Sequence, residues 1–200
     1  MLALSAALNA PVEGAWFGYL GCEGEMAKIR MWAVIGAKGV GKSVTIGHLM
    51  GEFGRGENGL KPPSNSGVKE IPLRGGGYLD VLGRRQSLQE AGKPPQEFAT
   101  RIEAMSRRND QSNPNIVSQY FNILFALRSD RKNNLPLAEE YLSYLLKRSW
   151  HLEKIVLLSP GSREERVFRR FGVPICYIYE SNDRDVSDLV GQVRNHFGWA

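Results

Sequence analysis

The sequence contains few of the residues from which disulfide frameworks and zinc sites are built. It has two cysteines, Cys22 and Cys176, among 200 residues, and three histidines at unrelated spacings. So few cysteines do not form a disulfide framework, and this usage is typical of a reducing, cytoplasmic compartment. The histidines, at positions 48, 151 and 196, do not have the spacing of zinc ligands. We therefore expect neither a disulfide scaffold nor a zinc site.

Long apolar runs are also missing, and so is positive charge at the start of the chain. No apolar stretch approaches 18 residues and the mean hydropathy is −0.32, so the sequence predicts no membrane span. Residues 1–27 contain no lysine or arginine, whereas the chain is basic from Lys28 onward. This shift in composition predicts an N-terminal arm or extension over residues 1–25 and one domain over residues 26–200.

The net charge of +5 and the pI near 9.3 are compatible with a nucleic-acid partner but do not favour one. The lysines and arginines are scattered along the chain and form no basic tail. The apolar fraction of 42% and the charged fraction of 24% are those of a soluble globular chain.

A glycine-rich segment, GAKGVGKS at residues 36–43, stands between a strand-like run (31–35) and a helical pattern. We expect this helix to turn an apolar face inward through Val44, Ile46, Leu49 and Met50. The sequence G-x-x-x-x-G-K-[ST] requires this strand–loop–helix setting. Its glycines let successive backbone N–H groups face a phosphate, and the following helix directs its positive end at the same anion. The segment therefore predicts a nucleoside triphosphate site.

Each fixed position of this phosphate loop has a chemical role. Lys42 would place a positive charge on the β- and γ-phosphates and act in catalysis, and the Ser43 hydroxyl would be a ligand of Mg²⁺. The predicted nucleotide-binding residues of this segment are Gly36, Ala37, Lys38, Gly39, Val40, Gly41, Lys42, Ser43 and Val44.

A phosphate-loop site also needs a carboxylate opposite Ser43, usually at the end of a second strand, to hold the metal ion. The best candidate is Asp80, which closes a short apolar run 38 residues beyond Lys42 and is followed three residues later by Gly83. The sequence predicts Asp80 as the second metal ligand.

With these two motifs the chain resembles the G domain of Ras-like and translation-factor-class GTPases. GAKGVGKS is similar to the first motif of that family, and Asp80 to Gly83 is similar to its DxxG motif at a similar spacing. The resemblance implies Mg²⁺ and GTP or GDP as ligands, with Gly83 beside the nucleotide. It also implies an α/β fold with a doubly wound, mostly parallel sheet and helices on both faces. The further strands are expected at 122–127, 154–158 and 175–179, and the further helices at 135–146 and 186–197.

The chain departs from the family pattern at two places. Where the family reads guanine with Asn-Lys-x-Asp, this chain has Ser159-Pro160-Gly161-Ser162, so Ser159 is a predicted nucleotide contact but guanine specificity stays open and ATP is not excluded. Where the family often places a water-orienting glutamine directly after DxxG, two arginines precede Gln86. We expect Gln86 to orient water and Arg84 to face the transferring phosphate.

Two segments are expected to bind a protein partner. Residues 51–77 are rich in glycine and proline and are predicted to be a loop that orders on nucleotide binding. Residues 84–115 are predicted to be a basic insert with a short helix near Phe98, Ile102 and Met105.

The leading hypothesis is a small GTPase-like switch that hydrolyses GTP slowly and signals to a protein partner. The alternatives are an ATP-driven nucleic-acid or packaging-type motor, a small-molecule kinase and a binding module without hydrolysis. Against the motor, no apolar run ends in the Asp-Glu pair of such ATPases, since Asp130 follows its strand only after Arg128 and Ser129.

Overall fold

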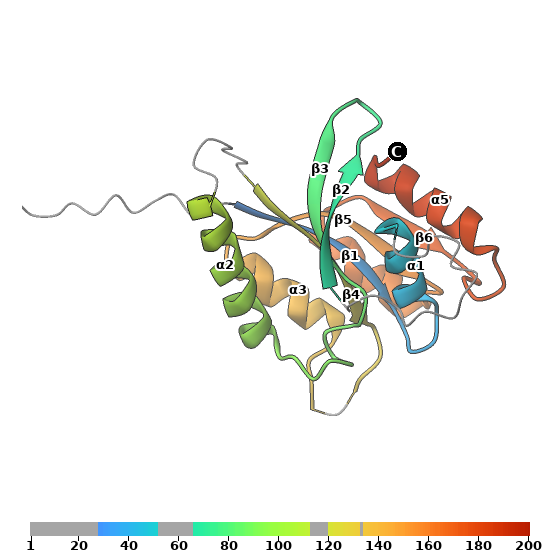
Figure 1. The fold of residues 1–200 in the computed structure, drawn as a ribbon. Coiled ribbons are helices and arrows are strands. Elements are labelled where there is room, and N and C mark those ends of the chain that lie inside the picture. The colour runs from blue at the N-terminus through green and yellow to red at the C-terminus, as the bar shows by residue number, and fades with distance from the viewer. Residues whose placement is uncertain (1–27, 52–65, 113–119, 133) are drawn as a thin grey trace, which may run out of the picture.

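A computed structural model describes residues 28–51, 66–112, 120–132 and 134–200 of the chain. The expected arm over residues 1–25 lies outside these ranges. The described residues form one six-stranded sheet in the order β2-β3-β4-β1-β5-β6 (Figure 1). The strands are β1 (Lys28–Gly36), β2 (Ser66–Pro72), β3 (Tyr78–Arg84), β4 (Tyr120–Arg128), β5 (His151–Leu158) and β6 (Ile175–Ile178).

Helices connect these strands in an alternating order. They are α1 (Lys42–Leu49), α2 (Pro95–Ser112), α3 (Ala138–Lys147), α4 (Ser162–Phe168) with the 3₁₀ turn η1 (Arg169–Phe171), and α5 (Val186–Phe197). The strands and helices predicted around the phosphate loop, at 122–127, 135–146, 154–158, 175–179 and 186–197 are confirmed, with ends that shift by a few residues.

The neighbouring strands β3, β4, β1, β5 and β6 run parallel to one another. The edge strand β2 is antiparallel to its neighbour β3. β1 lies between β4 and β5. Its residues Met31 to Ile35 are all buried, which is the pattern of a central parallel strand covered on both faces. The predicted α/β fold with a mostly parallel sheet is therefore confirmed.

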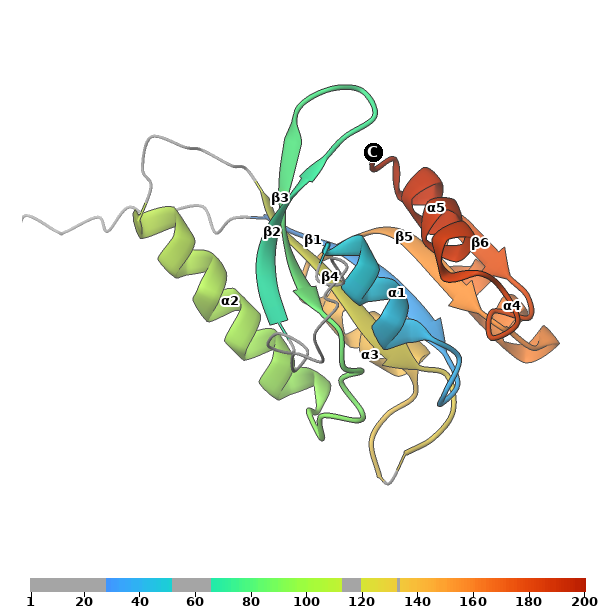
Figure 2. The ribbon, with the colours of Figure 1, turned by 45° about the vertical axis from the view of Figure 1, so that its right-hand side comes forward.

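Two hydrophobic cores cover the two faces of the sheet. On one face the sheet packs on α1 and α5, where Ile46, Val193 and Phe197 join a buried cluster with Val34. On the other face α2 and α3 contribute Phe98 and other apolar residues to a second cluster. Figure 2 shows the two helix layers on opposite sides of the strands. Helices thus lie on both faces of the sheet, as expected.

The segment predicted to be a loop over residues 51–77 contains a strand, so this prediction is wrong for its second half. Residues 66–72 form β2, the edge strand, and pair with β3 in register from Ser66 opposite Arg84 to Pro72 opposite Tyr78. The glycine run supplies the hairpin turn, because Gly76 and Gly77 have φ angles of 88° and 83°. Residues 52–65 lie outside the described part.

The predicted insert over residues 84–115 is also corrected. Its helix is α2, which has 18 residues and is not short. α2 is the crossover between the parallel strands β3 and β4, so it is part of the sheet's basic connection and not an addition to it. Phe98 and Ile102 face the core, as their spacing indicated. Within the described ranges, no helix has the length and apolar character needed to cross a membrane.

Candidate functional site

The phosphate loop lies where two neighbouring parallel strands send the chain to opposite faces of the sheet. From β1 the chain continues into α1 on one face, and from β4 it continues into α3 on the other. The two strand ends are level, since Gly36 pairs with Arg128 and the Ser129 amide donates to the Gly36 carbonyl at 3.2 Å. In open α/β sheets a ligand crevice forms at this kind of topological switch point.

The loop glycines are required by close approach and by backbone conformation. A Cβ at Gly36 would lie 2.6 Å from a Val40 methyl carbon and 2.7 Å from the Leu158 carbonyl oxygen. Gly39 and Gly41 have φ angles of 85° and 87°, in the left-handed region that side chains rarely adopt. The sequence therefore places glycine at the positions where this loop geometry needs it.

The Lys42 side chain turns back over the loop. Its ammonium group donates to the Gly36 carbonyl at 2.9 Å and to the Ala37 carbonyl, which uses two of its three N–H donors. Burial lowers the pKa of Lys42 below its usual value of 10.5, while the charges of Glu90 and Asp130 act in the opposite direction. Lys42 is thus a buried cation placed against the loop, with two carboxylates near it.

Ser43 and the base of the loop are tied to the ends of other strands. The Ser43 hydroxyl donates to the Arg85 carbonyl at 3.0 Å, directly after the end of β3. On the other side, the Ser181 hydroxyl donates to the Val40 carbonyl at 3.1 Å, and the Ser159 and Ser181 hydroxyls lie 2.9 Å apart. Ser159 therefore lies at the same edge as the loop, and its bond to Ser181 links it to the loop backbone.

The structure does not bring Asp80 to the phosphate loop, and its expected position at a strand end is wrong. Asp80 is the third residue of β3, is exposed, and pairs with Glu70 of β2. It precedes Arg85, which contacts Ser43, by five residues, or about 16 Å along an extended strand. Because the DxxG tetrapeptide begins within β3, the spacing between Lys42 and Asp80 in the sequence did not predict how far apart the two residues lie in the structure.

Gly83 is also placed away from the loop. A Cβ there would lie 2.6 Å from Met50 Cγ and 2.7 Å from its sulfur, so glycine at this position lets α1 pack closely on β3. These surroundings do not support the expected contact of Gly83 with nucleotide. Ile46 and Leu49 of α1, and Met50 directly after it, are buried as predicted, but Val44 is 42% exposed and does not face inward.

The two predicted catalytic residues after β3 differ in position. The Arg84 guanidinium lies 5.9 Å from the Phe98 ring of α2, on the face opposite α1, so its expected approach to the phosphate is not seen. Burial and the neighbouring Arg101 lower the pKa of Arg84 below its usual value. Gln86 is half-buried and follows Arg85, the residue whose carbonyl meets Ser43. Gln86 thus lies at the correct edge of the sheet.

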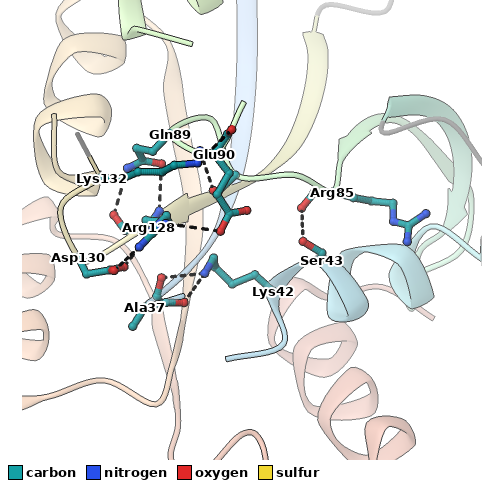
Figure 3. A network of polar contacts seen from close by, with 11 residues as sticks. Ala37, Lys42, Ser43, Arg85, Gln89, Glu90, Arg128, Asp130 and Lys132 are labelled. Atoms are coloured by element: carbon teal, nitrogen blue, oxygen red, sulfur yellow. Dashed lines mark hydrogen bonds and ion pairs between the residues drawn. The ribbon is translucent and has the colours of Figure 1, made fainter. Parts of the chain in front are cut away.

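A polar network that the sequence prediction missed lies beside Lys42 (Figure 3). Its centre is Arg128, the last residue of β4, whose side chain is 8% exposed. The Arg128 guanidinium forms a two-point ion pair with Asp130 and lies 3.9 Å from a carboxylate oxygen of Glu90. The bond to Asp130 raises the pKa of Arg128 and lowers that of Asp130, so both groups stay ionised.

Gln89 and Lys132 hold the segment around Glu90 in place. The buried Gln89 amide donates to the Arg128 carbonyl at 3.1 Å and accepts from the Arg128 amide at 3.0 Å. Lys132 donates to the Glu90 carbonyl at 3.3 Å. A sequence signal for this cluster exists, because polar residues directly after a buried parallel strand gather at its carboxyl edge. Residues 128–130, at the end of β4 and directly after it, fit this signal.

Comparison with known proteins identifies no relative: no family model, curated protein or solved structure matches the chain. Among the residues that the structure describes, no group of three or more histidine, cysteine or acidic side chains could hold a metal ion alone.

Proposed function

We propose that this chain binds a magnesium–nucleoside triphosphate complex through residues 36–43. The observation that supports this most directly is the loop itself, with left-handed glycines, a buried Lys42 and the start of α1 at one sheet edge. Backbone N–H groups and the helix dipole favour an anion there, and Lys42 adds a full positive charge. The Ser43 hydroxyl would be the protein ligand of Mg²⁺.

The more specific form of this proposal is a GTP-dependent molecular switch that acts on a protein partner. Only the phosphate loop supports it, since Asp80 and Gly83 lie on the β2–β3 hairpin and away from Lys42. The hairpin would still sense the nucleotide through Arg85, whose carbonyl accepts from Ser43. A switch requires that GTP binds more tightly than ATP and that partner binding differs between GTP and GDP.

The ATP-driven alternative gains from one observation. Asp130 follows β4 by two residues, yet its ion pair with Arg128 places it in the polar network beside Lys42 (Figure 3). The separation of Asp130 from its apolar run is thus no obstacle to a role at the site. DNA-stimulated ATP hydrolysis would favour this alternative over the switch.

The proposal is tested by titrating the full chain with fluorescent GTP, GDP, ATP and ADP, with and without Mg²⁺. We expect Mg²⁺-dependent binding of at least one triphosphate. Lys42→Ala should weaken it about 100-fold, since charge-assisted hydrogen bonds contribute about 1.5–3 kcal/mol each. Lys147→Ala is the matched control, because Lys147 is exposed at the end of α3 and lies outside residues 36–43. Equal affinity of the Lys42→Ala variant and the wild type, or no binding of any nucleotide, would overturn the proposal.

A further inference from the structure

Two carboxylates, Glu90 and Asp130, lie near Lys42, and the structure distinguishes their surroundings. Both oxygens of Asp130 bond to Arg128, one to Nε at 3.1 Å and the other to Nη2. This two-point pair uses the fork of the guanidinium and occupies the Asp130 carboxylate. Asp130 is thus held as the partner of Arg128.

Glu90 is held differently. A Glu90 carboxylate oxygen lies 3.9 Å from Arg128 Nη1, which is an ion-pair distance but beyond hydrogen-bond distance. The charge of Glu90 raises the pKa of Lys42 more than the charge of Asp130 does. Figure 3 shows the Glu90 side chain directed toward the end of the Lys42 side chain. Glu90 is therefore positioned by charge while its oxygens can still accept a hydrogen bond from water.

Arg128 connects the two carboxylates and is itself fixed. Asp130 orients its guanidinium, and Gln89 bonds to both its backbone amide and its carbonyl. Gln89 directly precedes Glu90 in the chain, so the clamp that fixes Arg128 also fixes the backbone of Glu90. The charged groups around Glu90 are Arg128 from β4, Lys42 from α1, and Lys132, whose ammonium donates to the Glu90 carbonyl at 3.3 Å.

We propose that Asp130, Arg128 and Glu90 form an ordered chain in which Glu90 accepts the proton of the attacking water while Arg128, oriented by Asp130, is a positioning residue. This inference rests on the proposed nucleotide site. In the step, a bond forms between the water oxygen and the γ-phosphorus, and the bond from that phosphorus to the β–γ bridging oxygen breaks. The nucleoside diphosphate leaves with the electron pair, and the water proton passes to the Glu90 carboxylate and then to solvent.

The test measures the dissociation constant of fluorescent nucleotide and the kcat of phosphate release for the full-length wild type and four variants. Glu90→Gln should lower kcat about 100-fold, since general base catalysis contributes about 10²–10⁴-fold. Asp130→Asn and Arg128→Lys should each lower kcat about tenfold, because each retains part of the contact and loses the two-point geometry. Asp130→Glu should restore more activity than Asp130→Asn. All four should bind nucleotide within about threefold of the wild type and melt at a similar temperature.

Two exposed residues supply matched controls, Glu70→Gln on β2 and Arg166→Lys on α4, and both should leave kcat unchanged. If the wild type binds no nucleotide, the proposed function itself fails. If the wild type binds nucleotide but releases no phosphate, only the present inference fails. It also fails if Asp130→Asn lowers kcat as much as Glu90→Gln, if Arg128→Lys retains full kcat, or if the variants lose nucleotide affinity in proportion to kcat.

Discussion

The carboxyl edge of β4 and the β2–β3 hairpin both carry acidic side chains, but they hold them in opposite ways. At the edge, Asp130 and Glu90 are paired with the buried Arg128 beside the phosphate loop. On the hairpin, Glu70 and Asp80 lie opposite each other across an antiparallel pair and are exposed to solvent. The comparison shows that position relative to the strand ends, more than residue type or spacing, decides which carboxylates lie beside the loop.

The largest expected effect contrasts a glycine of the loop with a glycine of the hairpin turn. Gly36→Ala should lower the free energy of unfolding by about 1–3 kcal/mol, because its Cβ would meet the fixed Leu158 carbonyl at 2.7 Å. It should also weaken nucleotide binding, since the loop must shift to relieve the contact. Gly75→Ala is the control, as nothing lies within 4 Å of its Cβ. Chemical denaturation measures both, and equal stability of the two variants would contradict the packing that we describe.

The second test compares Ser43 with Asp80, the two predicted metal ligands. Ser43→Ala should weaken Mg²⁺-dependent nucleotide binding roughly tenfold or more, a loss of about 1.4 kcal/mol, because it removes the proposed protein ligand of the ion. Asp80→Asn should leave the affinity unchanged, since Asp80 precedes Arg85, the residue that contacts Ser43, by five residues, or about 16 Å along an extended strand. Titration with and without Mg²⁺ separates the two variants. An equal loss in both would restore Asp80 to the site and break the comparison.

The sequence was sufficient for the parts of the fold that depend on local pattern. Continuous apolar runs predicted β1, β4 and β5, and the loop motif predicted the need for glycine at Gly36, where the backbone is closely approached, and at Gly41, which is left-handed. It was insufficient where pairing partners matter. The antiparallel pairing of β2 with β3 places Asp80 in mid-strand, and no short pattern encodes that register.

The site beside the loop depends in the same way on non-local contacts. Gln89 and Arg128 are 39 residues apart and meet only because β4 lies between β3 and β1. In the sequence, a charged residue at the end of an apolar run, such as Arg128, argues against burial of that residue. Its ion pair with Asp130 explains how the structure buries this charge.

The third prediction uses pH to test whether the charge of Lys42 binds phosphate. The lowered pKa of Lys42 means that the folded protein loses this charge at a lower pH than an ordinary lysine does. Bound phosphate requires the charged form, so nucleotide affinity should fall as the pH rises toward 10.5, beginning below that value. Lys42→Arg should keep its affinity over this range, since arginine stays charged. Titrations between pH 7 and pH 10 measure the effect, and identical pH profiles for the two proteins would exclude Lys42 as the phosphate cation.

The smallest expected effect concerns a half-buried histidine outside the site. Burial and the charge of Lys154 lower the pKa of His196 below 6.5, and its Nε2 atom is buried with no hydrogen-bond partner in the described structure. Lys42 has two carboxylates that oppose its shift, whereas Lys154 strengthens that of His196. The unfolded chain therefore binds a proton at His196 more readily, so stability should be full above pH 6.5 and fall as the pH drops toward the folded pKa.

His196→Gln should remove this part of the acid dependence, and His151→Gln should retain it, because His151 is exposed at the start of β5. Denaturant unfolding of the three proteins between pH 7.5 and pH 5 measures the difference. A wild-type stability that rises on acidification would show that His196 gains a partner when it is charged.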